Sequence, residues 1–74
     1  MHTMNDMEIG DTARVVQLNI EGSMRRRLLD IGLIEGTKIE CLQKSPLGDP
    51  AAYLIRGAVI AIRSEDSRRV CICT

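Results

Sequence analysis

Residues 46–63 read PLGDPAAYLIRGAVIAIR, and this stretch decides the fold class of the chain. Two prolines, one glycine and one aspartate fall within residues 46–50. They predict a tight chain reversal, because proline fixes φ, glycine allows a positive φ and aspartate can bond its own backbone. The apolar runs Ala51–Ile55 and Ala58–Ile62 predict two strands, with Gly57 at a bulge or tight corner between them.

A short helix is predicted upstream of this stretch. Ser23 is a suitable N-cap for it. Met24, Leu28 and Ile31 recur at i, i+4 and i+7, so they share one face. Gly32 stands where a left-handed residue would end the helix. A helix of about ten residues is too short to be stable alone, so we expect its apolar face to pack on the strands.

Further strands are predicted at residues 13–18, 37–43 and 70–73, and one helical turn at residues 64–66. Five short strands joined by tight turns predict a mainly β domain closed into a small barrel, because closure removes exposed sheet edges. The helix lies between the first two strands, and the helical turn precedes the last. This single domain is assigned to residues 9–74. Residues 1–8 are polar and aperiodic, and we expect them to form a loose N-terminus that Met7 and Ile9 order in part.

The turn residues of the predicted barrel are glycines and prolines between the periodic segments. We expect the glycines to lie at corners, at least two of them with positive φ, because glycine adopts that conformation without steric cost. The residues assigned this structural role are Gly32, Gly36, Pro46, Gly48, Pro50 and Gly57.

Composition and charge argue against several classes of partner. Ten basic and ten acidic residues cancel, so no net field attracts nucleic acid or anionic lipid. The longest unbroken apolar run, Ala58–Ile62, is far shorter than the roughly 18–20 residues of a membrane helix. The first residues, MHTMNDME, lack the basic start and apolar stretch of a signal peptide. We therefore expect a cytoplasmic protein that neither binds nucleic acid nor inserts into a membrane.

The chain contains almost no residues in arrangements that could perform catalysis. The single histidine, His2, lies in the predicted loose terminus, so no cysteine is expected to pair with a histidine on a rigid element. The glycines are spaced as turn residues and form no phosphate-binding run. The sequence therefore predicts that the protein is not an enzyme and has no catalytic residues.

The cysteines raise the question of a metal site. Cys71 and Cys73 lie on one face of the last predicted strand, which points outward if Val70 and Ile72 face the core. Cys41 shares the inward face of Ile39, and thiols divided between two faces cannot surround a tetrahedral ion. We therefore expect no resident cofactor, with Cys71 and Cys73 as the alternative candidates for weak binding of Fe²⁺ or another divalent metal.

Arg25, Arg26 and Arg27 follow one another at the start of the predicted helix. One interpretation is a basic patch for an acidic partner. The other is a solvated helix face, in which Arg26 pairs with Asp30 at i, i+4. Cations near a helix N-terminus are electrostatically unfavourable, so a negatively charged partner surface deserves a test.

With this pattern laid out, residues 13–72 resemble the FeoA family of ferrous-iron transport accessory proteins. The resemblance rests on pieces that follow one another in the family's order. They are residues 28–32 (LLDIG), 32–36 (GLIEG), 46–50 (PLGDP), 56–57 (RG), 62–63 (IR) and 65–66 (ED). Two departures, Glu35 in place of a frequent proline and the small Ala58 after the RG pair, leave the turn glycines untouched.

The resemblance implies an SH3-like barrel in the cytoplasm that associates with FeoB, the membrane protein that imports Fe²⁺ and carries a GTP-binding domain. We therefore hypothesise a small accessory protein that binds the cytosolic part of the FeoB transporter. A weak metal-binding regulatory domain and an orphan SH3-like domain of an iron-dependent repressor system remain as alternatives, and weak self-association is left open. The residues predicted to contact the partner are Arg25, Arg26, Arg27, Leu47 and Asp49.

Overall fold

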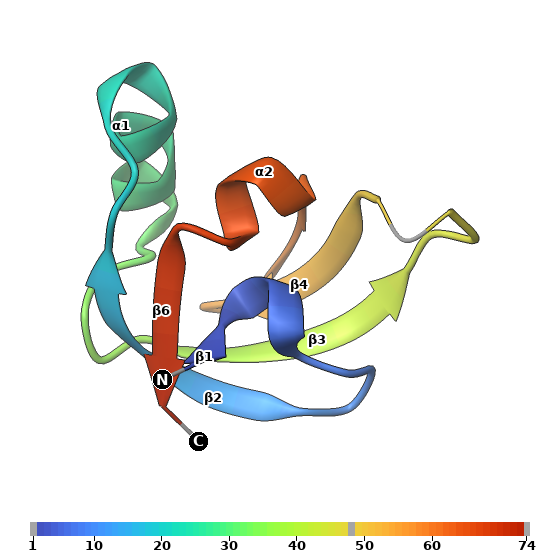
Figure 1. Ribbon diagram of the computed structural model, residues 1–74. Coiled ribbons are helices and arrows are strands. Elements are labelled where there is room, and N and C mark those ends of the chain that lie inside the picture. Colours follow the sequence, from blue (N-terminus) through green and yellow to red (C-terminus); the bar gives the residue numbers. More distant parts are fainter. Residues whose placement is uncertain (1, 48, 74) are drawn as a thin grey trace.

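A computed structural model describes residues 2–47 and 49–73 of the chain (Figure 1). Short strands dominate it, and two helices and one 3-10 turn connect them. In chain order the elements are β1 (His2–Thr3), η1 (Met4–Asp6), β2 (Thr12–Leu18), α1 (Gly22–Ile31), β3 (Lys38–Lys44), β4 (Ala51–Ile55), β5 (Ala58–Ile62), α2 (Ser64–Ser67) and β6 (Val70–Cys73). Within the described ranges, neither helix is long and apolar enough to cross a membrane.

The strands form one antiparallel sheet in the order β1-β6-β2-β3-β4-β5. Figure 1 shows the sheet curling round the interior, with α1 standing at one end. The prediction of a closed, five-stranded barrel is wrong on both counts. The described residues contain six strands, and β1 and β5 remain as two unpaired edges of the sheet. A two-residue strand of polar residues has no periodicity to reveal it, and closure depends on how far the whole sheet coils.

The N-terminal residues pack against the sheet, so the expectation of a loose segment is also wrong for the described part. His2 and Thr3 pair with Ile72 and Cys71 of β6. Met4, the first residue of η1, and Met7, its C-cap, are buried in the core. The Tyr53 hydroxyl donates a hydrogen bond to the Met4 carbonyl oxygen at 3.1 Å. Two methionines among polar residues are a weak sequence signal, although together they anchor the segment.

Helix α1 follows the predicted amphipathic pattern but starts earlier than expected. Its N-cap is Glu21, and the predicted N-cap Ser23 lies inside the first turn. Leu28 is buried, and Met24 and Ile31 pack partly against the same core. The helix ends at Gly32, whose φ is 102°, as the sequence predicts. The missing side chain of this glycine leaves room for the Arg56 side chain, which a Cβ at this position would meet.

The hairpin of β4 and β5 has the bounds that the sequence predicts. Its loop consists of Arg56 and Gly57, with φ values of 50° and 84°. Positive φ at both residues is the signature of a type I′ turn, so the junction is a tight corner without a bulge. Gly36 also has positive φ, whereas Gly48 lies outside the described residues. The prediction of at least two positive-φ corners is therefore confirmed.

Candidate functional site

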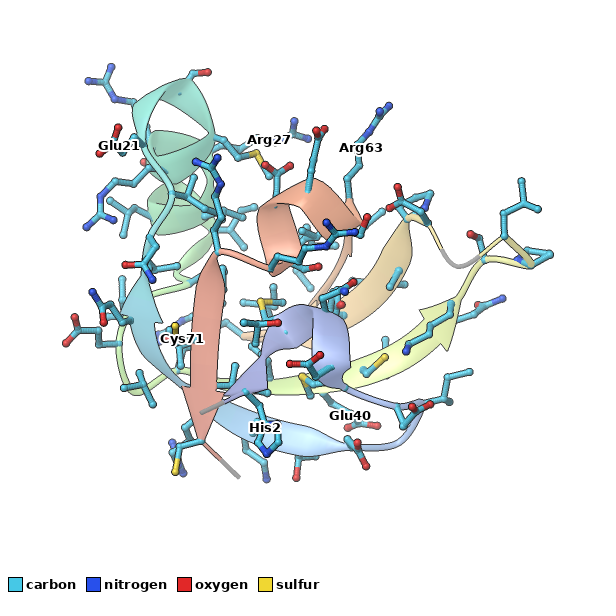
Figure 2. The ribbon with its side chains drawn as sticks, viewed as in Figure 1. His2, Glu21, Arg27, Glu40, Arg63 and Cys71 are labelled. Carbon is cyan, nitrogen blue, oxygen red and sulfur yellow. The ribbon has the colours of Figure 1, made fainter. Side chains whose placement is uncertain are left out.

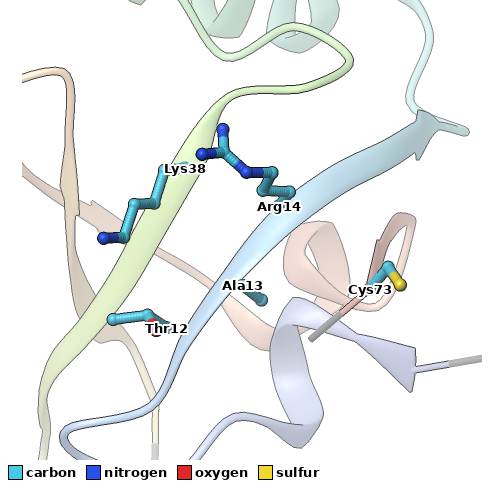
Figure 3. A pocket seen from close by; sticks show the side chains of 5 residues that line it. All are labelled: Thr12, Ala13, Arg14, Lys38 and Cys73. Carbon is cyan, nitrogen blue, oxygen red and sulfur yellow. The ribbon is translucent and has the colours of Figure 1, made fainter.

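A shallow hollow of about 480 Å³ lies on the outer face of β2 and β3 (Figure 3). Arg14 stands opposite Lys38 in the strand register, and the Arg14 guanidinium donates a hydrogen bond to the Gly36 carbonyl oxygen at 2.9 Å. Cys73 of β6 stands opposite Arg14 on its other side. The lining residues Thr12, Ala13, Arg14, Lys38 and Cys73 include no carboxylate or imidazole. The hollow thus offers two cations and no acid–base pair, an arrangement that the sequence reasoning missed.

The thiols lie as the strand alternation predicts. Cys41 is buried, and this burial raises the pKa of its thiol above the usual value. Cys71 is half-buried, and its sulfur accepts a hydrogen bond from Asn19 Nδ2 at 3.5 Å. Cys73 is exposed on the outer face. Within residues 2–47 and 49–73, no group of three or more His, Cys, Asp or Glu side chains could hold a metal ion. Weak metal binding through Cys71 and Cys73 stays a prediction.

The three helix arginines do not act as one group. The Arg25 guanidinium donates to the carbonyl oxygens of Leu18 at 3.0 Å and Ile20 at 3.3 Å, so it ties α1 to the end of β2. Arg26 and Arg27 are exposed. Among the described residues the ion pair found joins Lys44 to Glu8. The i, i+4 pair of Arg26 with Asp30 therefore does not form in this part of the chain. Arg26 and Arg27 are thus the members of the group whose charge faces solvent.

The turn between β3 and β4 presents Leu47 almost completely to solvent, with 95% of the residue exposed. Asp49 binds within the protein: its Oδ1 accepts a hydrogen bond from the Ser64 backbone N–H at 2.8 Å. This bond satisfies a free amide at the start of α2 and anchors the turn to that helix. Figure 1 shows the turn and α1 at opposite ends of the molecule. The structure therefore separates Leu47 from the arginines, so the predicted contact residues do not form one patch.

A second hollow, of about 200 Å³, lies beside this turn on the outer face of β4 and β5. Ala52 and Ala61, which face each other across the two strands, form part of its wall. Ser45 lines it too, and its buried Oγ has no hydrogen-bond partner within the described ranges. Sequence reasoning did not find this feature, although small residues at facing positions of neighbouring strands are its signal.

Comparison with known proteins gives a consistent result. Residues 2–73 match the family model of the FeoA domain. The chain is 31% identical over 67 residues to the Fe(2+) transport protein A/Fe(2+) transporter FeoB fusion protein of Porphyromonas gingivalis. The alignment covers 90% of this chain but 8% of that protein, so this chain corresponds to a small part of its relative.

Solved structures agree with the family match. The solution structure of FeoA from Chlorobium tepidum superposes with a TM-score of 0.90 at 31% identity, over 95% of this chain and 67% of that one. The zinc complex of FeoA from Stenotrophomonas maltophilia, described as a prokaryotic SH3 domain protein, has a TM-score of 0.86 at 21% identity, over 99% of this chain and 91% of that one. Two structures of a manganese-dependent transcriptional repressor contain the same fold in 39% and 35% of their chains, with TM-scores of 0.83 and 0.84 at 17% and 18% identity. The fold is therefore SH3-like.

Proposed function

Because the chain belongs to the FeoA family, which is linked to ferrous iron transport, we propose that it is an accessory protein that docks on a FeoB-type transporter. The docking partner is the cytosolic part of that transporter, which places this chain in the cytoplasm. The chain acts there as a binding module that regulates transport and performs no chemistry of its own. The first hollow fits this proposal, since its lining holds cations and a thiol but no carboxylate or imidazole.

The fused relative is the observation that carries the proposal. In the Porphyromonas gingivalis protein, by its name, transport protein A and the transporter FeoB are parts of one chain. A covalent link holds two modules at an effective concentration of about millimolar, so even a weak contact between them is populated. Two modules that act on each other gain most from such a link, which supports the same association for this separate chain.

We assign the main contact to Leu47 at the tip of the β3–β4 turn. An apolar side chain this exposed gains most from burial, about 1.5–3 kcal/mol for a leucine. The base of the turn is fixed, because the Ser45 N–H donates to the Pro50 carbonyl oxygen at 3.2 Å and Asp49 bonds α2. An exposed apolar tip suits a modest, transient interface. Asp49 thus supports the contact by fixing the turn.

Calorimetric titration of the purified cytosolic domain of a FeoB-type transporter tests this proposal. Leu47→Asp is expected to weaken binding at least about tenfold, the equivalent of about 1.4 kcal/mol, without lowering the melting temperature. Ile9→Asp is the matched control, because Ile9 is another apolar residue with 61% of its surface exposed. Arg26→Glu combined with Arg27→Glu tests the helix face separately.

Two results would overturn parts of this proposal. Absence of binding by the unaltered protein, at concentrations up to about millimolar, would remove docking as its function. Equal weakening by Leu47→Asp and Ile9→Asp, or loss of binding only in the double arginine variant, would remove the turn as the contact.

A further inference from the structure

We propose that the free edge of β5 binds an extended, acid-flanked segment of a partner protein, which adds to the sheet as a further strand. This surface is separate from the tip of the β3–β4 turn, and the proposal does not depend on the identity of the transporter. Three features carry it: unpaired backbone groups, an apolar strand without protection, and an arginine at each end.

The backbone of β5 has a free side. The strand is last in the sheet order, and β4 is the only element of the described chain with extensive contacts to it. A two-residue loop closes on a hydrogen-bonded pair, here Ile55 and Ala58. Alternation along the strand then turns the N–H and C=O groups of Val59 and Ala61 away from β4. These groups form a ready template for an incoming strand.

The side chains of β5 leave this edge unprotected. Natural edge strands are usually short, carry lysine or proline, or are interrupted by a bulge. The five residues of β5 read AVIAI, and they pair with β4 without a register shift. Val59 has 64% of its surface exposed. An unprotected apolar edge invites pairing, so this edge is a candidate binding surface.

The charges at the ends of β5 select the occupant. Arg56 precedes the strand and Arg63 follows it, and both are exposed. Figure 2 shows Arg63 directed away from the body of the protein. In an antiparallel pair of two β5 strands centred on Ile60, Arg63 of each copy would lie opposite Gly57 of the other, one residue from its Arg56. This repulsion disfavours a second copy and favours a partner segment with carboxylates at its two ends.

The hollow beside the turn accounts for one side chain of that segment. Ala61 lies in its wall, and the partner residue opposite Ala61 would project from the same face of the extended sheet. A volume of about 200 Å³ accommodates a branched apolar side chain. The expected motif is therefore an acidic residue, alternating apolar residues and a second acidic residue about seven positions later, the span from Arg56 to Arg63.

The probe for this test is the peptide acetyl-Asp-Thr-Val-Thr-Val-Thr-Val-Asp-amide, with a control peptide that has lysine at both ends. Titration of the labelled protein is followed by amide NMR shifts and by hydrogen exchange. The acidic peptide is expected to shift amides along β5 and to slow exchange at Val59 and Ala61. The lysine-ended peptide is expected to bind at least about tenfold more weakly.

Two variants of Ala61 separate strand addition from simple contact. Ala61→Pro removes one outward N–H but no bond to β4, so the domain stays folded. It is expected to abolish binding, whereas Ala61→Thr keeps the amide and is expected to bind as the unaltered protein does. Arg63→Glu leaves one cation and one anion at the ends of β5, so it is expected to remove the preference between the two peptides.

Three outcomes would overturn the proposal. They are equal binding by the Ala61→Pro and Ala61→Thr variants, shifts located away from β5, and equal affinity for the two peptides. Sedimentation of the protein alone completes the test. A dimer that Ala61→Pro dissociates would show that the occupant is a second copy, which contradicts the assignment to a partner segment.

Discussion

The two edges of the sheet, β1 and β5, solve the problem of an unpaired strand in opposite ways. The β1 edge is two polar residues long and runs directly into η1, where Met4 and Met7 fasten the chain to the core. The β5 edge is five apolar residues long, and within residues 2–47 and 49–73 its extensive contacts are with the hairpin partner β4. One edge is shortened and anchored, and the other is left accessible. The difference teaches that exposure of β5 is specific to that edge, because the same small domain protects its other edge.

The first prediction breaks the anchored edge. Met4→Ala is expected to lower the free energy of unfolding by about 2–5 kcal/mol, because it leaves a cavity beneath η1. A domain of this size has about 3–5 kcal/mol of net stability, so a large unfolded fraction is expected in buffer. Val59→Ala on the other edge is expected to cost less than about 1 kcal/mol. Urea denaturation of both variants measures the two costs.

Similar losses of unfolding free energy for Met4→Ala and Val59→Ala would contradict the contrast between the anchored β1 edge and the accessible β5 edge. They would show that the N-terminal segment contributes no more to the core than the exposed edge does. Met4→Leu, which keeps the volume, serves as the control and is expected to cost under about 1.5 kcal/mol.

The second prediction concerns Tyr53, which links β4 to the anchored edge. Tyr53→Phe removes the donor to the Met4 carbonyl oxygen, and we expect a loss of about 1 kcal/mol at neutral pH. Burial raises the pKa of Tyr53 above its ordinary 10.0, and that of Cys41 above 9.0. Both groups are therefore held neutral in the fold.

The pH dependence follows from these two pKa values. A group with a raised pKa contributes its full stabilisation while the pH is below its ordinary pKa. This contribution is lost as the pH rises beyond that value. Stability is therefore expected to decline above about pH 9. The free energy of unfolding of the Tyr53→Phe variant is expected to decline less steeply above about pH 10. Urea denaturation across this pH range measures this difference. Parallel curves for the two proteins would argue against a buried, neutral tyrosine.

The third prediction sharpens the comparison at the exposed edge. Arg56 has a positive φ of 50° beside Gly57, and Asn-Gly is the preferred pair for this turn. Arg56→Asn is expected to raise the free energy of unfolding by up to about 1 kcal/mol, because asparagine tolerates the left-handed region better. It is also expected to weaken binding of the acidic peptide. Denaturation and peptide titration on one sample measure both effects, and a destabilised variant would show that packing of Arg56 over Gly32 outweighs the backbone strain.

Local chemistry accounts for the features that the sequence predicted well. The bounds of β4, β5 and β6, the glycine end of α1 and the opposite faces of Cys41 and Cys73 all follow from period-two alternation and turn residues. The candidate contact residues fared differently. Exposure of Leu47 follows from its place in a Pro-Gly-Asp-Pro turn, whereas the bonds of Arg25 and Asp49 join segments that pattern reasoning treats separately.

The sequence by itself thus determined the five longer strands, the glycine corners and the family, since each follows from short runs of residues in the chain. Tertiary structure decided whether the barrel closes, which edge is anchored and which side chains are free to meet a partner. Those outcomes depend on contacts such as Tyr53 with Met4 and Asp49 with Ser64, which lie far apart in the chain. The curl of the sheet brings these residues together, and that curl is a property of all six strands at once.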